Sequence, residues 1–266
     1  MATLQSANIT IMIKAARKAS GKLKRDYGEI EQLQVSKKGQ ADFVTVADIR
    51  TEEILHDTLS HARPEYGFLM EESGTIMGDD PNRRWIIDPI DGTTNFIHGI
   101  PHFAISIALE EKGKITAGVI YEPIHDQMFW AEKGNGAWLN DRRMRVSGRT
   151  QMEQSIFATG IPFIGRGDHK QFLQQIESVM AASAGIRRFG SAALDLAYVA
   201  AGRFDGFWET NLQPWDIAAG IIIVREAGGM ISEIDGRDGM LRTGSILAAN
   251  PTLYKELGQT ILNIVK

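Results

Sequence analysis

The run Trp85-Ile86-Ile87-Asp88-Pro89-Ile90-Asp91-Gly92-Thr93-Thr94-Asn95 constrains this chain more than any other segment, because an apolar stretch stops abruptly at two carboxylates. Residues 84–87 predict a buried strand, and a stiff Pro-Ile spacer separates Asp88 from Asp91. The Gly-Thr-Thr that follows suits a tight turn or the start of a helix. Two acids this close repel each other strongly unless a cation or a proton lies between them. The run therefore indicates adjoining places for a divalent metal and a phosphate at a strand end.

Two further acidic segments could complete such a site. A pair of glutamates beginning at Glu71 follows the apolar residues 66–70, and Asp216 follows Gln-Pro-Trp at the start of a predicted helix. Each acidic segment also has a plain structural alternative: a strand end in water, an acidic helix cap, or an Asx turn. The chain has no cysteine, and its histidines form no pair on one helical face. Hard oxygen ligands of this kind favour Mg²⁺ over Zn²⁺.

The composition is that of a soluble globular protein, with 266 residues of which 43% are hydrophobic and 23% charged. The absence of cysteine excludes a disulfide framework, an iron–sulfur cluster and a thiol nucleophile. The first residues lack the pattern of a signal peptide, and no run approaches the ~18 apolar residues of a membrane span. The net charge of −4 argues against nucleic-acid binding as the main task. We therefore expect a cytoplasmic protein with no membrane partner and no direct sequence-specific binding of nucleic acid.

The residue pattern predicts an α/β fold class, with an α+β half at residues 1–147 and an α/β half at 148–266. In the first half, helices are predicted at 8–26 and 45–63, a strand at 30–36, a turn at 37–40, and antiparallel strands at 103–109, 115–121 and 127–131. In the second half, strands are predicted at 155–159, 186–189 and 206–209, and helices at 168–182, 191–202 and 215–227. Asn250-Pro251 is predicted to open the last helix.

The three acidic segments, in this order, resemble the inositol monophosphatase family, which belongs with fructose-1,6-bisphosphatase to a lithium-sensitive, metal-dependent phosphatase superfamily. Residues 85–96 are similar to the first family signature and residues 215–229 to the second. Residues 187–202 and 205–209 look like the bacterial SuhB-type branch. The resemblance implies a layered αβαβα sandwich, with Glu71 and the Asp88–Asp91 motif in the first half and Asp216 in the second. It also implies a homodimer.

Site roles are implied residue by residue by the resemblance. The ligands of two or three Mg²⁺ ions would be Glu71, Asp88, the backbone carbonyl of Ile90, Asp91 and Asp216. Glu71 and Thr93 would be catalytic, because they would position and deprotonate the attacking water. The substrate-binding residues would be Asp91, Gly92, Thr93, Arg187, Gly190, Ser191, Ala192, Glu209 and Asp216. Lys37, Asp42 and Asp48 match a mobile loop that would complete the site.

The expected activity is Mg²⁺-dependent hydrolysis of inositol 1-phosphate and related small polyol monophosphates by a metal-activated water. Fructose-1,6-bisphosphate, histidinol phosphate and phosphoadenosine phosphate are alternative substrates within the superfamily. Met70 stands where many members have glycine, and Gln213-Pro214 replaces the His-Cys of animal enzymes, so substrate preference cannot be copied from those enzymes.

A second, regulatory role is the alternative from another class. Some SuhB-type proteins act on ribosomal RNA transcription complexes by joining RNA polymerase and Nus factors. The basic clusters at 142–145 and 187–188 could serve as docking sites for such partners.

Overall fold

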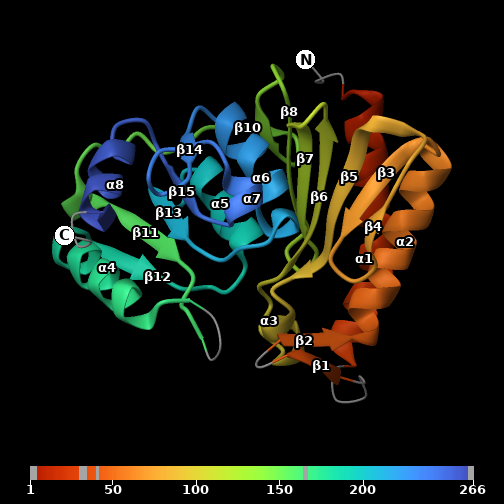
Figure 1. Cartoon of the computed structure of the whole chain (residues 1–266), viewed down its shortest axis with the longest axis horizontal. Helices are drawn as coiled ribbons and strands as arrows, with labels where there is room; N and C mark the ends of the chain where they lie inside the picture. Colours follow the sequence, from red (N-terminus) through yellow and green to blue (C-terminus); the bar gives the residue numbers. More distant parts are fainter. Residues whose placement is uncertain (1–4, 30–34, 40–41, 164–166, 263–266) are drawn as a thin grey trace.

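Helices and sheets alternate in five layers across the molecule (Figure 1). The computed structural model describes residues 5–29, 35–39, 42–163 and 167–262. Three hydrophobic cores hold the layers together: one under the first pair of helices, one around the central helices, and one under the last pair. The predicted αβαβα sandwich is therefore confirmed. Within the described ranges, no helix is long and apolar enough to span a bilayer.

Two long helices form the first outer layer, and each begins at a side-chain cap. Helix α1 (Ala7–Gly28) follows Ser6, whose hydroxyl accepts a first-turn N–H. Helix α2 (Val46–Ala62) follows Thr45, which forms a capping box with Asp48. Both helices pack against each other and against one face of the larger sheet (Figure 1). Both lie where the sequence predicts helices.

The larger sheet has eight strands in the order β10-β9-β8-β7-β6-β5-β3-β4. The strands are β3 (Tyr66–Met70), β4 (Gly74–Ile76), β5 (Asp80–Asp91), β6 (Ala104–Glu111), β7 (Lys114–Glu122), β8 (Gln127–Glu132), β9 (Ala137–Leu139) and β10 (Arg142–Met144). All neighbours are antiparallel except β3 and β5. Helices cover both faces of this sheet, which explains why the end of β5 is buried residue after residue. The predicted antiparallel strands of the middle segment are confirmed.

The central layer consists of helices α5 (Ala192–Ala200) and α6 (Pro214–Glu226), with the short α7 (Met240–Thr243) beside α6. Helix α6 packs on β5 to β8, and α5 reaches the smaller sheet on the other side. The approach of α6 to β7 is close: a Cβ added at Gly118 would lie 2.7 Å from the carbonyl oxygen of Ala219. Glycine at position 118 therefore allows the central helix to lie directly on the sheet.

The smaller sheet has five strands in the order β12-β11-β13-β15-β14, and α4 and α8 cover its outer face (Figure 1). The elements are β11 (Ile156–Thr159), α4 (His169–Ala182), β12 (Gly185–Arg187), β13 (Gly206–Glu209), β14 (Met230–Ser232), β15 (Ile246–Ala249) and α8 (Tyr254–Leu262). Outside the layers lie β1 (Val35–Gly39), β2 (Asp42–Thr45), α3 (Thr93–Ile97) and the 3₁₀ turn Met152–Gln154.

Several predicted boundaries are wrong; the predicted strand 186–189, for example, ends at Arg187. Strand β1 continues to Gly39, so a turn does not begin at residue 37; residues 30–34 and 40–41 of these predictions lie outside the described chain. Helix α8 begins at Tyr254 rather than at residue 251, because the Asn250 side chain accepts two N–H groups of an intervening turn. The division at 147/148 stays a prediction; the larger sheet ends at Met144 and the smaller begins at Ile156.

Candidate metal centre and active site

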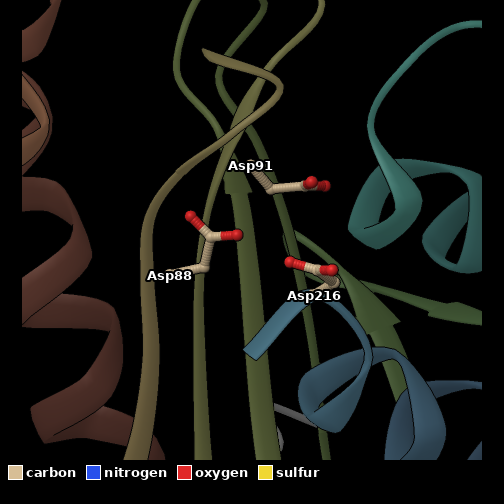
Figure 2. A group of neighbouring side chains, drawn as sticks. All are labelled: Asp88, Asp91 and Asp216. Carbon is tan, nitrogen blue, oxygen red and sulfur yellow. The ribbon is translucent and has the colours of Figure 1, made fainter. Parts of the chain in front are cut away.

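Three aspartates converge where the larger sheet meets the central helices. Asp88 and Asp91 lie at the end of β5, and Asp216 lies in the first turn of α6. One carboxylate oxygen of each lies within 4.8 Å of the others. Figure 2 shows the three side chains directed toward a shared space between the strand end and the helix. Asp216 is more than a hundred residues from Asp88 and Asp91 in the sequence, and the fold brings the three together, as expected for one site.

A bulge in β5 explains how Asp88 and Asp91 reach the same place. Residues three apart on a regular strand point to opposite faces of a sheet. Here Asp88 pairs with Ser106 and Asp91 pairs with Ala104, so three steps along β5 match two along β6. The extra residue restores both carboxylates to one side. Sequence spacing alone does not reveal this, because it depends on pairing with the neighbouring strand.

Each carboxylate is held by backbone or hydroxyl donors. Asp88 Oδ1 accepts the N–H of Ile90 at 2.9 Å, and Asp216 Oδ2 accepts the N–H of Gln213 at 2.8 Å. Asp91 Oδ2 accepts the Ser191 hydroxyl at 2.5 Å and the Ala193 N–H at 2.7 Å, at the start of α5. These donors fix the orientation of each carboxylate beside its two neighbours.

The electrostatics of the cluster fit a divalent cation. Burial raises the pKa of Asp88 well above its ordinary value, and the negative charges of Glu71, Asp91 and Asp216 raise it further. Burial also raises the pKa of Asp91 to about 6, against the lowering effect of its hydrogen bonds. The pKa of Asp216 is raised by burial and then by Asp91. Crowded carboxylates of this kind are costly by themselves and suit a hard cation with oxygen ligands.

Glu71 is placed by the turn after β3. Its N–H donates to the Ile87 carbonyl at 3.2 Å, and its charge acts on Asp88. Sequence reasoning missed the residue that holds this turn, Glu52 of α2. The buried Glu52 carboxylate accepts the backbone N–H groups of Glu72 and Ser73, at 2.8 and 2.9 Å. Its signal in the sequence is an acid on the face of α2 that also carries Leu55 and Leu59.

Thr93 contacts Asp48 as well as the segment between Asp88 and Asp91. Its hydroxyl lies 3.2 Å from Asp48 Oδ1 and 3.0 Å from the carbonyl oxygen of Ile90. Asp48 was expected in a loop, but it lies within α2 and is buried, which is a correction. Lys37 lies in β1 and Asp42 in β2; their side chains lie outside the described structure.

A cavity of about 180 Å³ adjoins the acid cluster. Its lining residues are Asp91, Gly92, Thr93, Thr94, Gly160, Phe163, Arg188, Gly190, Ser191, Ala192, Asp195, Glu209, Leu212 and Asp216. The structure thus brings together most of the predicted substrate-binding residues. Arg187 is the exception: its guanidinium donates to the Ile186 carbonyl and it is not among the lining residues, while the next residue, Arg188, lines the cavity. Two adjacent arginines in the sequence do not show which of them the loop before α5 places against the cavity.

Glu209 also lines this cavity. Burial raises its pKa to about 8, Asp91 adds to the shift, and Arg188 opposes it. Its carboxylate packs on Gly160, where an added Cβ would lie 1.8 Å from Oε1. Asp195, which the sequence reasoning also missed, lines the same cavity from the first turns of α5. A lone acid in the apolar segment 192–200 was its available signal.

Comparison with known proteins agrees with this geometry. A sequence model of the inositol monophosphatase family matches residues 5–266. The chain is 54% identical to the inositol-1-monophosphatase of Mesorhizobium japonicum over 253 residues, 95% of each protein. It is 43% identical to the Nus factor SuhB of Escherichia coli over 249 residues, 94% of this chain and 93% of that protein. The crystal structure of the extragenic suppressor protein suhB from Bartonella henselae superposes with a TM-score of 0.94 at 55% identity, over 96% of this chain and 98% of that one.

The matches cover nearly the whole of this chain and of each relative, and the solved structure has the same layers. The acid cluster, the order of the acidic segments and the family match all point the same way. The chain belongs to the inositol monophosphatase family.

Proposed function

We propose that this chain is a Mg²⁺-dependent phosphomonoesterase that hydrolyses inositol 1-phosphate and related small polyol monophosphates. The observation that carries the proposal is the convergence of Asp88, Asp91 and Asp216 beside a polar cavity. Relatives that are 51–54% identical are named inositol-1-monophosphatase, which supports the substrate.

The metal ligands in this proposal are Glu71, Asp88, the carbonyl oxygen of Ile90, Asp91 and Asp216. They would hold two Mg²⁺ ions, with Glu71 also serving a third, weaker site. Magnesium bound there supplies neutralisation of the phosphate charge and a bound water of lowered pKa.

The chain's own groups then position the reactants. Thr93 and Glu71 orient the water and take its proton. Asp48 accepts a hydrogen bond from the Thr93 hydroxyl and so holds it in place. Backbone N–H groups of Gly92 and Thr93 face the phosphate. Glu209, with the segment from Gly190 to Ala192, binds the alcohol. Arg188 takes the place that the sequence assigned to Arg187.

Steady-state kinetics with an aspartate variant test this proposal. Wild type should hydrolyse inositol 1-phosphate only with Mg²⁺, and Asp216→Asn should lose about 10³-fold or more in kcat. Asp168→Asn is the matched control, because Asp168 also caps a helix but lies outside the cavity. Near-normal turnover by Asp216→Asn at saturating Mg²⁺ would contradict the proposal. Lithium should inhibit wild type by competing for a metal site.

The same assay decides among substrates. Fructose 1,6-bisphosphate, histidinol phosphate, phosphoadenosine phosphate and glycerol 2-phosphate are compared with inositol 1-phosphate by kcat/KM. A higher kcat/KM on one of the first three would keep the phosphatase assignment and replace the substrate.

A second role in transcription is favoured by similarity to proteins named Nus factor SuhB and by exposed basic side chains at Arg142, Arg143 and Arg187. We propose that the chain can also bind RNA polymerase or Nus factors, and that it forms a homodimer. Purified chain should then retain RNA polymerase in a pull-down, with Asp91→Asn binding as well as wild type and Arg142→Glu binding less. Light scattering at the mass of one chain would exclude the dimer.

A further inference from the structure

Asp195 is a buried carboxylate that lines the cavity, and the proposed reaction gives it no role. It is 1% exposed, and its Oδ1 atom has no hydrogen-bond partner among the described residues. We propose that Asp195 binds a hydroxyl of the leaving alcohol, alongside Glu209, and so selects substrates with several hydroxyl groups. This inference rests on the proposed phosphatase function.

The start of α5 does not need the Asp195 side chain. An acid near a helix N-terminus normally accepts first-turn N–H groups. Here Ser191 Oγ accepts the N–H of Leu194 at 3.3 Å, and Asp91 accepts the N–H of Ala193 at 2.7 Å. The N–H of Asp195 itself donates to the Ser191 carbonyl at 3.0 Å. Capping therefore does not account for a carboxylate at this position.

Because Asp195 Oδ1 is buried without a hydrogen-bond partner among the described residues, this side chain lowers the stability of the folded protein. A buried polar atom left unsatisfied loses its hydrogen bonds to water without replacement, which destabilises the folded state, and more so when the atom is charged. An apolar residue would fit the apolar pattern of α5, whose neighbouring positions are all Ala, Leu, Tyr or Val. A ligand that donates a hydrogen bond to Asp195 would remove this cost. An alcohol hydroxyl is such a donor, and a phosphate dianion is not.

The ionisable groups that act on Asp195 are two other carboxyls and one arginine. Glu209 is the carboxyl that raises the pKa of Asp195 most after burial, ahead of Asp91, while Arg188 lowers it. Asp195 and Glu209 each keep a carboxyl oxygen that can accept a hydrogen bond. The same acids attract hydroxyl donors of the alcohol. The substrate class that this arrangement fits is a phosphate monoester with at least two free hydroxyl groups.

Two substrates separate this role from a structural one. Inositol 1-phosphate offers free hydroxyl groups, and phenyl phosphate offers none. In Asp195→Leu, kcat/KM on inositol 1-phosphate should fall about tenfold or more, mainly through KM, since a buried hydrogen bond to the substrate is lost. The value for phenyl phosphate should stay within about threefold. Asp195→Asn should lie between, because its amide oxygen still accepts a hydrogen bond.

Asp26→Asn is the matched control. Asp26 is 4% exposed, has an unpartnered Oδ2 among the described atoms, and lies in α1 outside the cavity. Its substrate ratio should equal that of wild type.

Equal losses on both substrates, or no loss on either, would overturn the inference while leaving the phosphatase assignment intact. Loss of the folded state in both Asp195 variants, seen by circular dichroism, would assign a structural role and also overturn it. Failure of wild type on every phosphate monoester would instead refute the proposed function.

Discussion

Asp91 combines two tasks in one carboxylate. Its Oδ2 accepts from Ser191 and Ala193, which anchors the start of α5. The same side chain belongs to the cluster with Asp88 and Asp216. Because burial raises the pKa of Asp91 to about 6, the ionised form costs free energy in the folded state when no cation compensates it. A cation bound at this cluster would offset that cost.

Replacing Asp91 by Asn should stabilise the metal-free protein and abolish its activity. As the pH rises from 3.8 to about 6, the unfolded chain gives up this proton before the folded chain does, so the free energy of unfolding falls. Above that window the loss is complete, about 1–3 kcal/mol. Urea denaturation in EDTA should show Asp91→Asn as more stable than wild type at pH 8, with most of the difference gone at pH 4. Equal stability at pH 8 would contradict the stated cost.

At the scale of elements, local residue patterns predicted most helices and strands because each buries a periodic apolar face. The acids at the ends of apolar segments likewise indicated where the site lies. The β5 bulge could not be predicted, since it depends on pairing of Asp88 and Asp91 with β6. Glu52 and Asp195 were missed for a related reason. An acid in a helix is usually solvated, and only tertiary contacts show that these two are buried.

The turn between β3 and β4 offers an element-scale test. Glu52→Gln removes the charge that holds the N–H groups of Glu72 and Ser73, and so loosens the position of Glu71. The Mg²⁺ concentration for half-maximal activity should rise about tenfold, as for other supports of metal ligands, with KM for substrate little changed. Glu53→Gln is the control, because Glu53 is the next residue in the chain and its side chain is exposed. An unchanged Mg²⁺ requirement in Glu52→Gln would show that the turn is held by other contacts.

At the scale of the whole molecule, the site joins layers that are far apart in sequence. Asp88 and Asp91 come from the larger sheet, and Asp216 comes from the central helices (Figure 2). A cation bound by all three therefore clamps the sheet to the helices. In the metal-free protein, burial and mutual repulsion raise the pKa values of the three acids, so their ionised forms destabilise the packing of the sheet on the helices. Metal binding and global stability should be linked for this reason.

Magnesium should accordingly raise the melting temperature of wild type, and the rise should depend on pH. At 100 times its dissociation constant a ligand adds about 2.7 kcal/mol to the free energy of unfolding. Because binding requires ionised carboxylates and the pKa of Asp91 is about 6, the effect should be largest at pH 8 and nearly absent at pH 4. Calorimetry with Mg²⁺ or with NaCl of equal ionic strength measures it. Asp168→Asn should keep the rise and Asp216→Asn should lose most of it, since only the second removes a carboxylate from the clamp. A rise of equal size at both pH values, or in both variants, would place the stabilising cation elsewhere on the molecule.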